Sequence, residues 1–435
     1  MTVFAPAQPP AHQLADLRAV TVELEGAPVD LVRVAGEGGV FWQRDGAGLA
    51  GRGMAATLEA GAGMDGPAAR DLAAALGQVE TSDQVTRPGT GPVAIGALPF
   101  DPTAPGRLVI PSLLVGRDTT GHQWVTVVAP ENAGGPLGPG GARRLVEDIA
   151  RPRPGEPKVW SPDRFSLDSP LSHEEWCRVV TEATEAIGRG ELHKVVLARE
   201  IVVAANRPFV LGDILRRLLL LHPSCMVFAV DGFVGASPEL LVGRRGPEVR
   251  SHPLAGTISR SGDRATDEAL SAGLLASAKD RHEHGLVVDA VADGLRPFCE
   301  RLEVPAEPAI VALRNVAHLG TELVGTLGTI APSWALDLVA ALHPTPAVGG
   351  TPTAPALEFL RHHERLDRGR YAGPVGWMDR RGDGDWAVGI RSAEVSGATA
   401  RLFAGVGVVA GSDPEDELAE TQLKLQALLA ALVRP

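Results

Sequence analysis

Three charged residues near the end of the chain have a spacing that could bind a metal ion. Glu417, Glu420 and Lys424 stand at positions i, i+3 and i+7, so a helix would place two carboxylates and one ammonium on one face. Such a face is most often exposed and held by ion pairs. Carboxylate oxygens are also the ligands that Mg²⁺ prefers, completed by waters and an anionic ligand. The sequence leaves both interpretations open.

A second candidate is the run Arg-His-Glu-His over residues 281–284. His282 and His284 are two residues apart, so on a helix they do not share a face and cannot chelate one zinc ion together. Glu283 could still supply one oxygen ligand to a hard cation such as Mg²⁺. A zinc site is therefore not expected, and a carboxylate contribution to a magnesium site is.

The segment Gly-Val-Gly-Val-Val-Ala at residues 405–410 fits the glycine pattern of dinucleotide-binding sites. That pattern requires a helix opening at the glycines inside a βαβ unit. Here Gly-Ser-Asp-Pro-Glu-Asp intervenes before the last helix. The glycines are expected instead at the end of a strand, where they permit close backbone approach.

The elements that must position these groups alternate irregularly along the chain. A capping box at Ser172 and Glu175 predicts a helix that ends at Gly188. Further helices are expected over residues 212–222, over 280–302 with Pro297 kinking or shortening it, and from 414 onward. Strands are expected over residues 194–203, 225–237, 239–245, 248–252, 385–395 and 398–409. Strand meanders mixed with helices predict an α+β fold with a largely antiparallel sheet.

Two segments rich in Gly and Pro, residues 134–144 and 151–163, predict a boundary between about residues 130 and 165. We therefore expect an N-terminal subdomain over residues 1–160 and a catalytic region over residues 161–435. The N-terminal third contains few periodic patterns and predicts little by itself.

Composition excludes several classes of protein. The chain of 435 residues has 41 basic and 53 acidic residues, a net charge of −12 that would repel nucleic acid and anionic membranes. Its three cysteines, Cys177, Cys225 and Cys299, form no CxxC pair, and no run approaches 18 apolar residues. The beginning also lacks the pattern of a signal peptide. We expect a cytoplasmic protein, either a monomer or a small homo-oligomer, without nucleic-acid or membrane partners.

An ordered set of motifs from residue 193 to 424 resembles the chorismate-utilising enzymes, and within them the isochorismate synthases most closely. The motifs are HKVVLARE, FVGASPELLVGRR, HPLAGTISR, KDRHEHGLVV, HPTPAVGG, RYAGPVGW, GIRSAEV and FAGVGVVAGSDPEDELAETQLK. The resemblance implies a large two-layered α/β sandwich of mostly antiparallel sheets, with helices packed outside and the N-terminal part intertwined with the rest. It also implies chorismate as substrate.

The resemblance further implies an isomerisation of chorismate to isochorismate, in which water adds at C2 and the C4 hydroxyl leaves. Lys194 would be the general base and Glu239 the general acid. Relatives that add ammonia usually have Gln in place of Lys194. Aminodeoxychorismate synthases commonly have a nucleophilic Lys in place of Ala255, and relatives that eliminate pyruvate tend to have Thr in place of Ala347.

The remaining implied roles concern binding. Mg²⁺ would be held by Glu283, Glu417 and Glu420, and chorismate would be bound by Gly256, Thr257, His318, Ala347, Tyr371, Arg391, Gly407 and Lys424. For His318 a structural role in the core is almost as good an interpretation. Two functional alternatives remain: a salicylate synthase, which would go on to eliminate pyruvate, and a non-catalytic chorismate-binding subunit.

Overall fold

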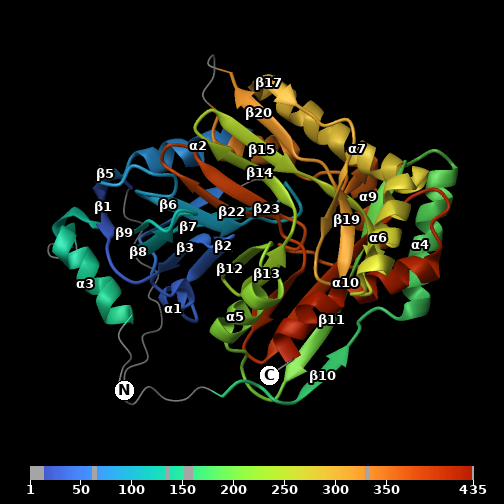
Figure 1. The fold of residues 1–435 in the computed structure, drawn as a ribbon, viewed down its shortest axis with the longest axis horizontal. Helices are drawn as coiled ribbons and strands as arrows, with labels where there is room; N and C mark the ends of the chain where they lie inside the picture. Colours follow the sequence, from blue (N-terminus) through green and yellow to red (C-terminus); the bar gives the residue numbers. More distant parts are fainter. Residues whose placement is uncertain (1–13, 61–65, 134–136, 151–159, 329–332, 434–435) are drawn as a thin grey trace.

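The computed structural model describes residues 14–60, 66–133, 137–150, 160–328 and 333–433 (Figure 1). The expectation about a signal peptide and most of the segment 151–163 therefore lie outside the described residues. Ten α-helices are described: α1 (Leu31–Ala35), α2 (Gly66–Gly77), α3 (Pro139–Ala150), α4 (His173–Gly188), α5 (Leu211–Leu221), α6 (Arg264–Ala276), α7 (Ala278–Leu295), α8 (Ala335–Leu342), α9 (Thr353–His363) and α10 (Pro414–Val433). Short 3-10 helices cover Leu14–Asp16, Glu131–Ala133 and Arg296–Phe298.

The largest sheet has 13 strands, and one of them, β21 (Gly350–Thr351), pairs only with β11. The other strands follow the order β10 (Phe165–Asp168), β11 (Lys194–Ala205), β25 (Thr399–Val408), β24 (Ser392–Ser396), β13 (Phe233–Ser237), β12 (Met226–Val230), β2 (Val40–Arg44), β3 (Ala47–Arg52), β8 (Leu113–Arg117), β9 (Gln123–Pro130), β1 (Leu17–Leu24), β5 (Glu80–Asp83).

The second sheet has nine strands and the third has three. The nine-stranded order is β17 (Cys299–Glu303), β20 (Leu323–Leu327), β15 (Glu248–His252), β14 (Leu240–Arg245), β23 (Gly384–Val388), β22 (Pro374–Asp379), β6 (Val93–Ala97), β7 (Gly106–Ile110), β4 (Ala56–Ala60). The small sheet has the order β16 (Leu254–Ser259), β19 (Val316–Gly320), β18 (Ala309–Ala312).

The predicted α+β class with mostly antiparallel sheets is confirmed. Among the strand pairs of the described residues, β1 with β5 is parallel and the others are antiparallel. The two large sheets pack face to face through a core that includes Trp42 and Phe228 from one sheet and Trp377 from the other. Figure 1 shows α4, α6, α7, α9 and α10 gathered at one end of the molecule, around β11 and β19.

Both large sheets combine strands from the two sides of the expected boundary. In the first sheet β2 pairs with β12, with Phe41 opposite Ala229. In the second sheet β6 pairs with β22, with Ile95 opposite Trp377. The division into residues 1–160 and 161–435 stays a prediction, and the hydrogen-bond ladders run across it.

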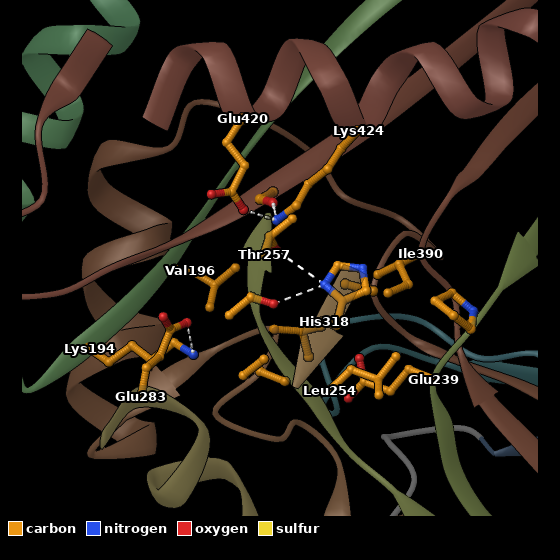
Figure 2. Close-up of a pocket in the computed structure, with 18 of the residues that line it drawn as sticks. Lys194, Val196, Glu239, Leu254, Thr257, Glu283, His318, Ile390, Glu420 and Lys424 are labelled. Carbon is orange, nitrogen blue, oxygen red and sulfur yellow. Dashed lines mark hydrogen bonds and ion pairs between the residues drawn. The ribbon is translucent and has the colours of Figure 1, made fainter. Parts of the chain in front are cut away.

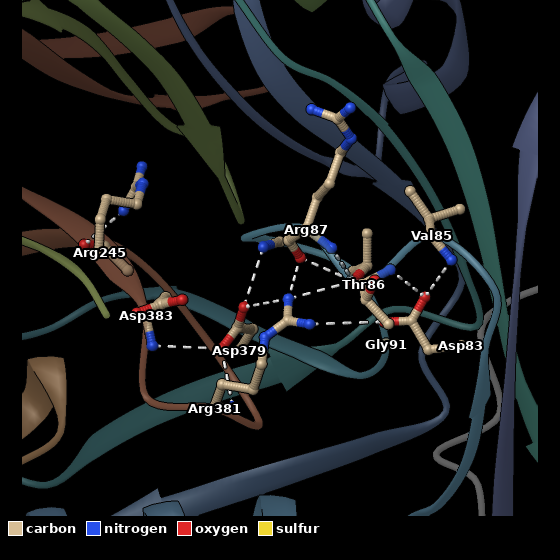
Figure 3. Close-up of polar contacts among 12 residues, drawn as sticks. Asp83, Val85, Thr86, Arg87, Gly91, Arg245, Asp379, Arg381 and Asp383 are labelled. Carbon is tan, nitrogen blue, oxygen red and sulfur yellow. Dashed lines mark hydrogen bonds and ion pairs between the residues drawn. The ribbon is translucent and has the colours of Figure 1, made fainter. Parts of the chain in front are cut away.

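A buried acidic residue fastens the turn between β22 and β23 to the loop after β5 (Figure 3). Asp379 is fully buried and accepts hydrogen bonds from the backbone N–H groups of Gly89, at 2.9 Å, and Arg381, at 2.8 Å. The Arg381 guanidinium lies 3.1 Å from the same carboxylate. These contacts satisfy a buried charge with several donors, which is the condition for keeping it in a core.

Two expected elements end earlier than the sequence suggested. The helix expected over residues 280–302 is α7, which ends at Leu295 and passes through a 3-10 turn containing Pro297 into strand β17. Pro297 has no N–H for the helical ladder, so it shortens the helix. The strand expected over residues 385–395 is two strands, β23 and β24, because the chain turns at Arg391, whose φ is 51°.

The strand expected over residues 225–237 is also two strands, β12 and β13, which form a hairpin because the chain reverses at Asp231 and Gly232, both with a left-handed φ. The other predicted elements are present. Ser172 and Glu175 form the predicted capping box at the start of α4, with the Glu175 backbone N–H 3.2 Å from the Ser172 hydroxyl. In the described part of the chain, the helices are all too short or too polar to span a lipid bilayer.

Candidate active site

One pocket brings together every site residue that the sequence analysis named. It is lined by Lys194, Glu239, Gly256, Thr257, Glu283, His318, Ala347, Tyr371, Arg391, Gly407, Glu417, Glu420 and Lys424. The residues come from ten separate elements or turns, so no single stretch of the chain forms the site. Figure 2 shows α10 along one side of the pocket, with Lys194 at one end and Glu239 at the other.

Lys194 begins strand β11 and is buried, with a side chain 1% exposed. Its Nζ lies 2.8 Å from Oε1 of Glu283, which reaches across from α7. Gly407 on the neighbouring strand β25 makes this contact possible, because a Cβ there would lie 2.5 Å from the Glu283 carboxylate and 2.8 Å from Cε of Lys194. Any larger residue at position 407 would push the two charged groups apart.

Glu239 occupies the short connection between β13 and β14 and is 3% exposed. Burial raises the pKa of its carboxyl to about 8, and this outweighs the opposing effect of the Lys194 charge. The group is therefore protonated at neutral pH, as a general acid must be before it donates.

His318 on β19 lies between the pocket wall and the guanidinium of Arg391. Its Nδ1 lies 3.0 Å from the backbone oxygen of Gly256 and 3.2 Å from the hydroxyl of Thr257. A carbonyl oxygen only accepts, so Nδ1 carries the hydrogen and Nε2 is left as an acceptor, 3.4 Å from the Arg391 guanidinium. Burial lowers the pKa of His318 to about 3, so the imidazole is neutral.

Arg391 is half-buried and has few hydrogen-bond partners among the described residues. Its left-handed φ of 51° turns the side chain out of the sheet and into the pocket. In the described part of the chain, the hydrogen bond of its guanidinium is a long one, 3.4 Å, to Nε2 of His318, and the side chain lines the pocket. A guanidinium with unused donors in a small cavity is suited to bind a carboxylate.

Helix α10 presents the predicted charged face, and that face is turned into the pocket instead of the solvent. Lys424 lies 2.6 Å from Glu420 and donates to the backbone oxygen of Gly405 at 2.8 Å. Burial raises the pKa of Glu417 to about 7, and the neighbouring Glu420 carboxylate adds to this shift. Although burial opposes it, the Lys424 ammonium holds the pKa of Glu420 below its usual value.

The donor set around Glu417 suits a hard divalent cation. Glu417 is a desolvated carboxylate beside a second carboxylate, and a cation would remove that repulsion. Carboxylate oxygens are the ligands that Mg²⁺ takes. In the described residues, however, three acidic, His or Cys side chains do not converge as a ready ligand set. Glu283 is drawn to Lys194 and Glu420 to Lys424.

The two positions that the resemblance uses to discriminate among relatives both lie in the pocket wall. Ala255 and Ala347 both line the pocket, so a Lys or a Thr at those positions would face the substrate. Tyr371, the only tyrosine of the chain, is stacked on Phe403 at 5.1 Å between ring centroids. Gly405 lies under its hydroxyl, since a Cβ there would be 2.9 Å from the Tyr371 oxygen.

The positions of their residues decide how two further motifs are interpreted, the Arg-His-Glu-His run and the glycine pattern near the end of the chain. His282 is exposed and His284 is buried, with Nε2 of His284 2.8 Å from the Thr321 hydroxyl, so the pair cannot share an ion. The glycines of residues 405–408 lie at the end of β25 and form no dinucleotide-binding turn.

Sequence reasoning missed several residues of the pocket wall. Lys279, Asp280 and Arg368 line the pocket, and Glu364 supports it from behind through Arg368. Lys279 and Asp280 belong to the quoted KDRHEHGLVV motif, which could have indicated them. Arg368 and Glu364 precede the RYAGPVGW motif, and no spacing rule connects them to a site.

The chain belongs to the chorismate-binding enzymes. The family model described as "Chorismate binding enzyme" matches residues 17–433. Among its relatives is the isochorismate synthase DhbC of Bacillus subtilis, 39% identical over 372 residues that cover 83% of this chain and 84% of the relative. The isochorismate synthase EntC of Escherichia coli is 34% identical over 343 residues, 78% of this chain and 80% of the relative.

A solved structure supports the same relationship. MenF, the menaquinone-specific isochorismate synthase from Escherichia coli, matches with a TM-score of 0.77 and 26% identity, covering 96% of this chain and 95% of that chain.

Proposed function

We propose that this chain converts chorismate to isochorismate with Lys194 as general base and Glu239 as general acid. The reaction adds water at C2 of the ring and releases the hydroxyl at C4, so a proton must be taken at one end of the ring and given at the other. The observation that carries the proposal is the position of a buried lysine and a protonated glutamic acid at opposite ends of one pocket (Figure 2). Close relatives that carry the name isochorismate synthase support the same reaction.

The acid is in the state that the reaction needs. Glu239, whose pKa is about 8, holds its proton at neutral pH and can give it to the leaving hydroxyl. The apolar surroundings raise the pKa of Glu239 to near the working pH. A group with such a pKa both holds and releases a proton readily.

The base must lose its own proton before it can accept one from water. Lys194 is buried at the start of β11, and its counter-ion is Glu283, 2.8 Å away. Substrate and cation binding that engage the Glu283 carboxylate would release the Lys194 side chain from this ion pair, so that it can face the attacking water.

Arg391 and its neighbours would orient the substrate. Chorismate is a dicarboxylate, and a protein with a net charge of −12 must supply local positive charge to bind it. Arg391 would bind the enolpyruvyl carboxylate, held in place by neutral His318. Lys424 and the backbone of Gly407 would contact the substrate from α10 and β25.

We further propose that Glu283, Glu417 and Glu420 hold a Mg²⁺ ion. The support is the chemistry of the donors: carboxylates in one pocket, one of them with a pKa raised to about 7 by burial and by its acidic neighbour. When bound, Mg²⁺ supplies positive charge against the ring carboxylate of the substrate.

The two alternatives from the sequence have weaker support. A salicylate synthase would need a group that promotes loss of pyruvate, and the pocket has Ala347 at the discriminating position. A non-catalytic subunit would have no reason to keep a buried acid and a buried base facing the same cavity.

The test is incubation of the purified protein with chorismate and Mg²⁺, followed by chromatographic identification of the product. Isochorismate with little pyruvate or salicylate is expected. Salicylate as the main product would overturn the assignment.

A further inference from the structure

A buried ion pair behind the pocket connects the two segments that we expect to decide the reaction. Glu364 and Arg368 have side chains that are 4% and 3% exposed, and they pair through Nη2 of Arg368 at 2.5 Å and through Nε at 2.7 Å. Neither residue was indicated by the motifs of the sequence. Burying two charges costs desolvation free energy, which the other contacts of the pair must offset.

The Glu364–Arg368 pair makes hydrogen bonds to one edge of β11, along a stretch where no described strand pairs with that edge. Strand β21 pairs with β11 only at Lys194 and Val195, and β10 joins β11 only from Val202 onward. Between these points the Glu364 carboxylate accepts from the backbone N–H of Ala198 at 2.6 Å. The Arg368 guanidinium donates to the backbone oxygen of Val196 at 2.6 Å. The ion pair therefore satisfies backbone groups that would otherwise be buried without partners.

Arg368 also holds the turn that carries Ala347. Its Nη1 donates to the backbone oxygen of Val348 at 2.8 Å, so one guanidinium bridges Val196, two residues after Lys194, and Val348, one residue after Ala347. A direct bond from the Val196 N–H to the Gly349 oxygen, 2.9 Å, lies beside this bridge. The planar guanidinium thus sets the spacing between the strand of Lys194 and the turn of Ala347.

The arginine is not available to bind substrate, although it lines the pocket. Its Nε and both Nη atoms are engaged by Glu364 and by the two carbonyl oxygens. Its face lies 4.2 Å from the ring of Phe100, which fixes the plane of the guanidinium. Arg391 differs in this respect, because among the described residues its guanidinium makes only the long hydrogen bond to His318.

We propose that Arg368, held by Glu364 and Phe100, is a positioning residue that places Lys194 and the Ala347 turn for reaction. The inference rests on the proposed role of Lys194. A displacement of about 1 Å of a reacting group can cost about 100-fold in rate, so loosening this bridge affects turnover. Substrate affinity depends on Arg391 and Lys424, which lie on other elements, and should change little.

The test compares Arg368→Lys with wild type for kcat, KM and thermal unfolding. Lysine keeps the charge and can pair with Glu364, but a single ammonium cannot bridge both carbonyl oxygens in the fixed geometry of a guanidinium. We expect kcat per folded molecule to fall about 100-fold with KM within about threefold. A merely structural role would lower the unfolding temperature and leave the kcat of the folded enzyme unchanged.

A milder variant and a matched control complete the experiment. Phe100→Leu removes the ring under the guanidinium and should lower kcat in the same direction by a smaller factor. Arg178→Lys changes an exposed pair of the same i,i+4 spacing, Arg178 with Glu182, and should leave kcat unchanged. Wild-type kcat in both Arg368→Lys and Phe100→Leu would overturn the inference. Failure of the proposed function would appear separately, as full activity in Lys194→Gln.

Discussion

The ammonium of Lys194 and the carboxylate of Glu283 lie 2.8 Å apart inside the pocket. The two residues have different proposed roles, one as the base for water and the other as a ligand of Mg²⁺. Their contact means that the base and the metal site share a charged group. Changes at either residue should therefore affect the other.

Lys194→Gln should abolish isochorismate formation, with a loss of at least about 100-fold in kcat, because the variant has no group that can accept a proton from water. Glutamine keeps most of the side-chain length and removes little core volume, so the fold should be retained. Chorismate binding, measured by calorimetry, should stay near the wild-type value. Normal turnover by this variant would exclude Lys194 as the base.

Glu239→Gln should mainly lower kcat, by about 10²–10⁴-fold, since glutamine cannot give a proton to the leaving hydroxyl. In the wild type, kcat should fall as the pH rises through about 8, where Glu239 loses its proton. This fall should be absent from the residual activity of the variant. A wild-type profile that stays flat from pH 7 to 10 would contradict the role of Glu239.

Glu239 should also give stability a pH dependence that can be measured without substrate. Its pKa is raised from 4.5 to about 8, so between these pH values the folded protein holds a proton that the unfolded chain has lost. Its contribution to the free energy of unfolding therefore decreases as the pH rises through this window, by up to about 1.4 kcal/mol per pH unit. Denaturant unfolding of Glu239→Gln should show a smaller slope than wild type, and an equal slope would count against the shift.

Arg391→Ala should weaken chorismate binding by about 2–5 kcal/mol, because one substrate carboxylate would be left buried without a partner. The measurement is the dissociation constant, together with KM. Arg264→Ala is the control, since Arg264 is an exposed residue of α6 whose ion pair, within the part of the chain that the structure describes, is with Glu268. If both variants bind chorismate equally well, the carboxylate clamp must lie elsewhere in the pocket.

Removal of Mg²⁺ should abolish activity, and its return should restore it. Glu420→Gln should lose activity at Mg²⁺ concentrations that saturate the wild type, because it removes one anionic ligand. Glu415→Gln makes the same change on an exposed turn of the same helix and should remain active. Full activity in the presence of EDTA would rule out the magnesium site.

Ala347→Thr should make pyruvate detectable in a coupled assay with lactate dehydrogenase. Position 347 lines the pocket, so a threonine hydroxyl there could orient the enolpyruvyl group toward elimination. The wild type should release little pyruvate under the same conditions. An unchanged ratio of pyruvate to isochorismate would show that the halt at isochorismate has another cause.

Local patterns in the sequence predicted a large part of the fold. The capping box at Ser172, the compact strand that begins at Lys194 and the helix that begins at Pro414 are present as expected. These features depend on neighbouring residues along the chain, so a single sequence contains their signal. The break between β23 and β24 was missed because the left-handed conformation of Arg391 arises from its place between two sheets, and arginine has no local preference for it.

The order of the motifs by itself indicated which residues belong to the site, and the structure places all of them around one pocket. The chemical state of these residues depends on how the chain packs in three dimensions. The charged face of α10 is turned into the pocket, Glu239 is protonated, and Lys194 contacts Glu283, because elements distant in the chain pack around them. The bridge from Arg368 to Val196 and Val348 depends in the same way on three segments meeting in space. Burial and the distance between charges set proton affinity, and both are properties of packing that residue spacing does not contain.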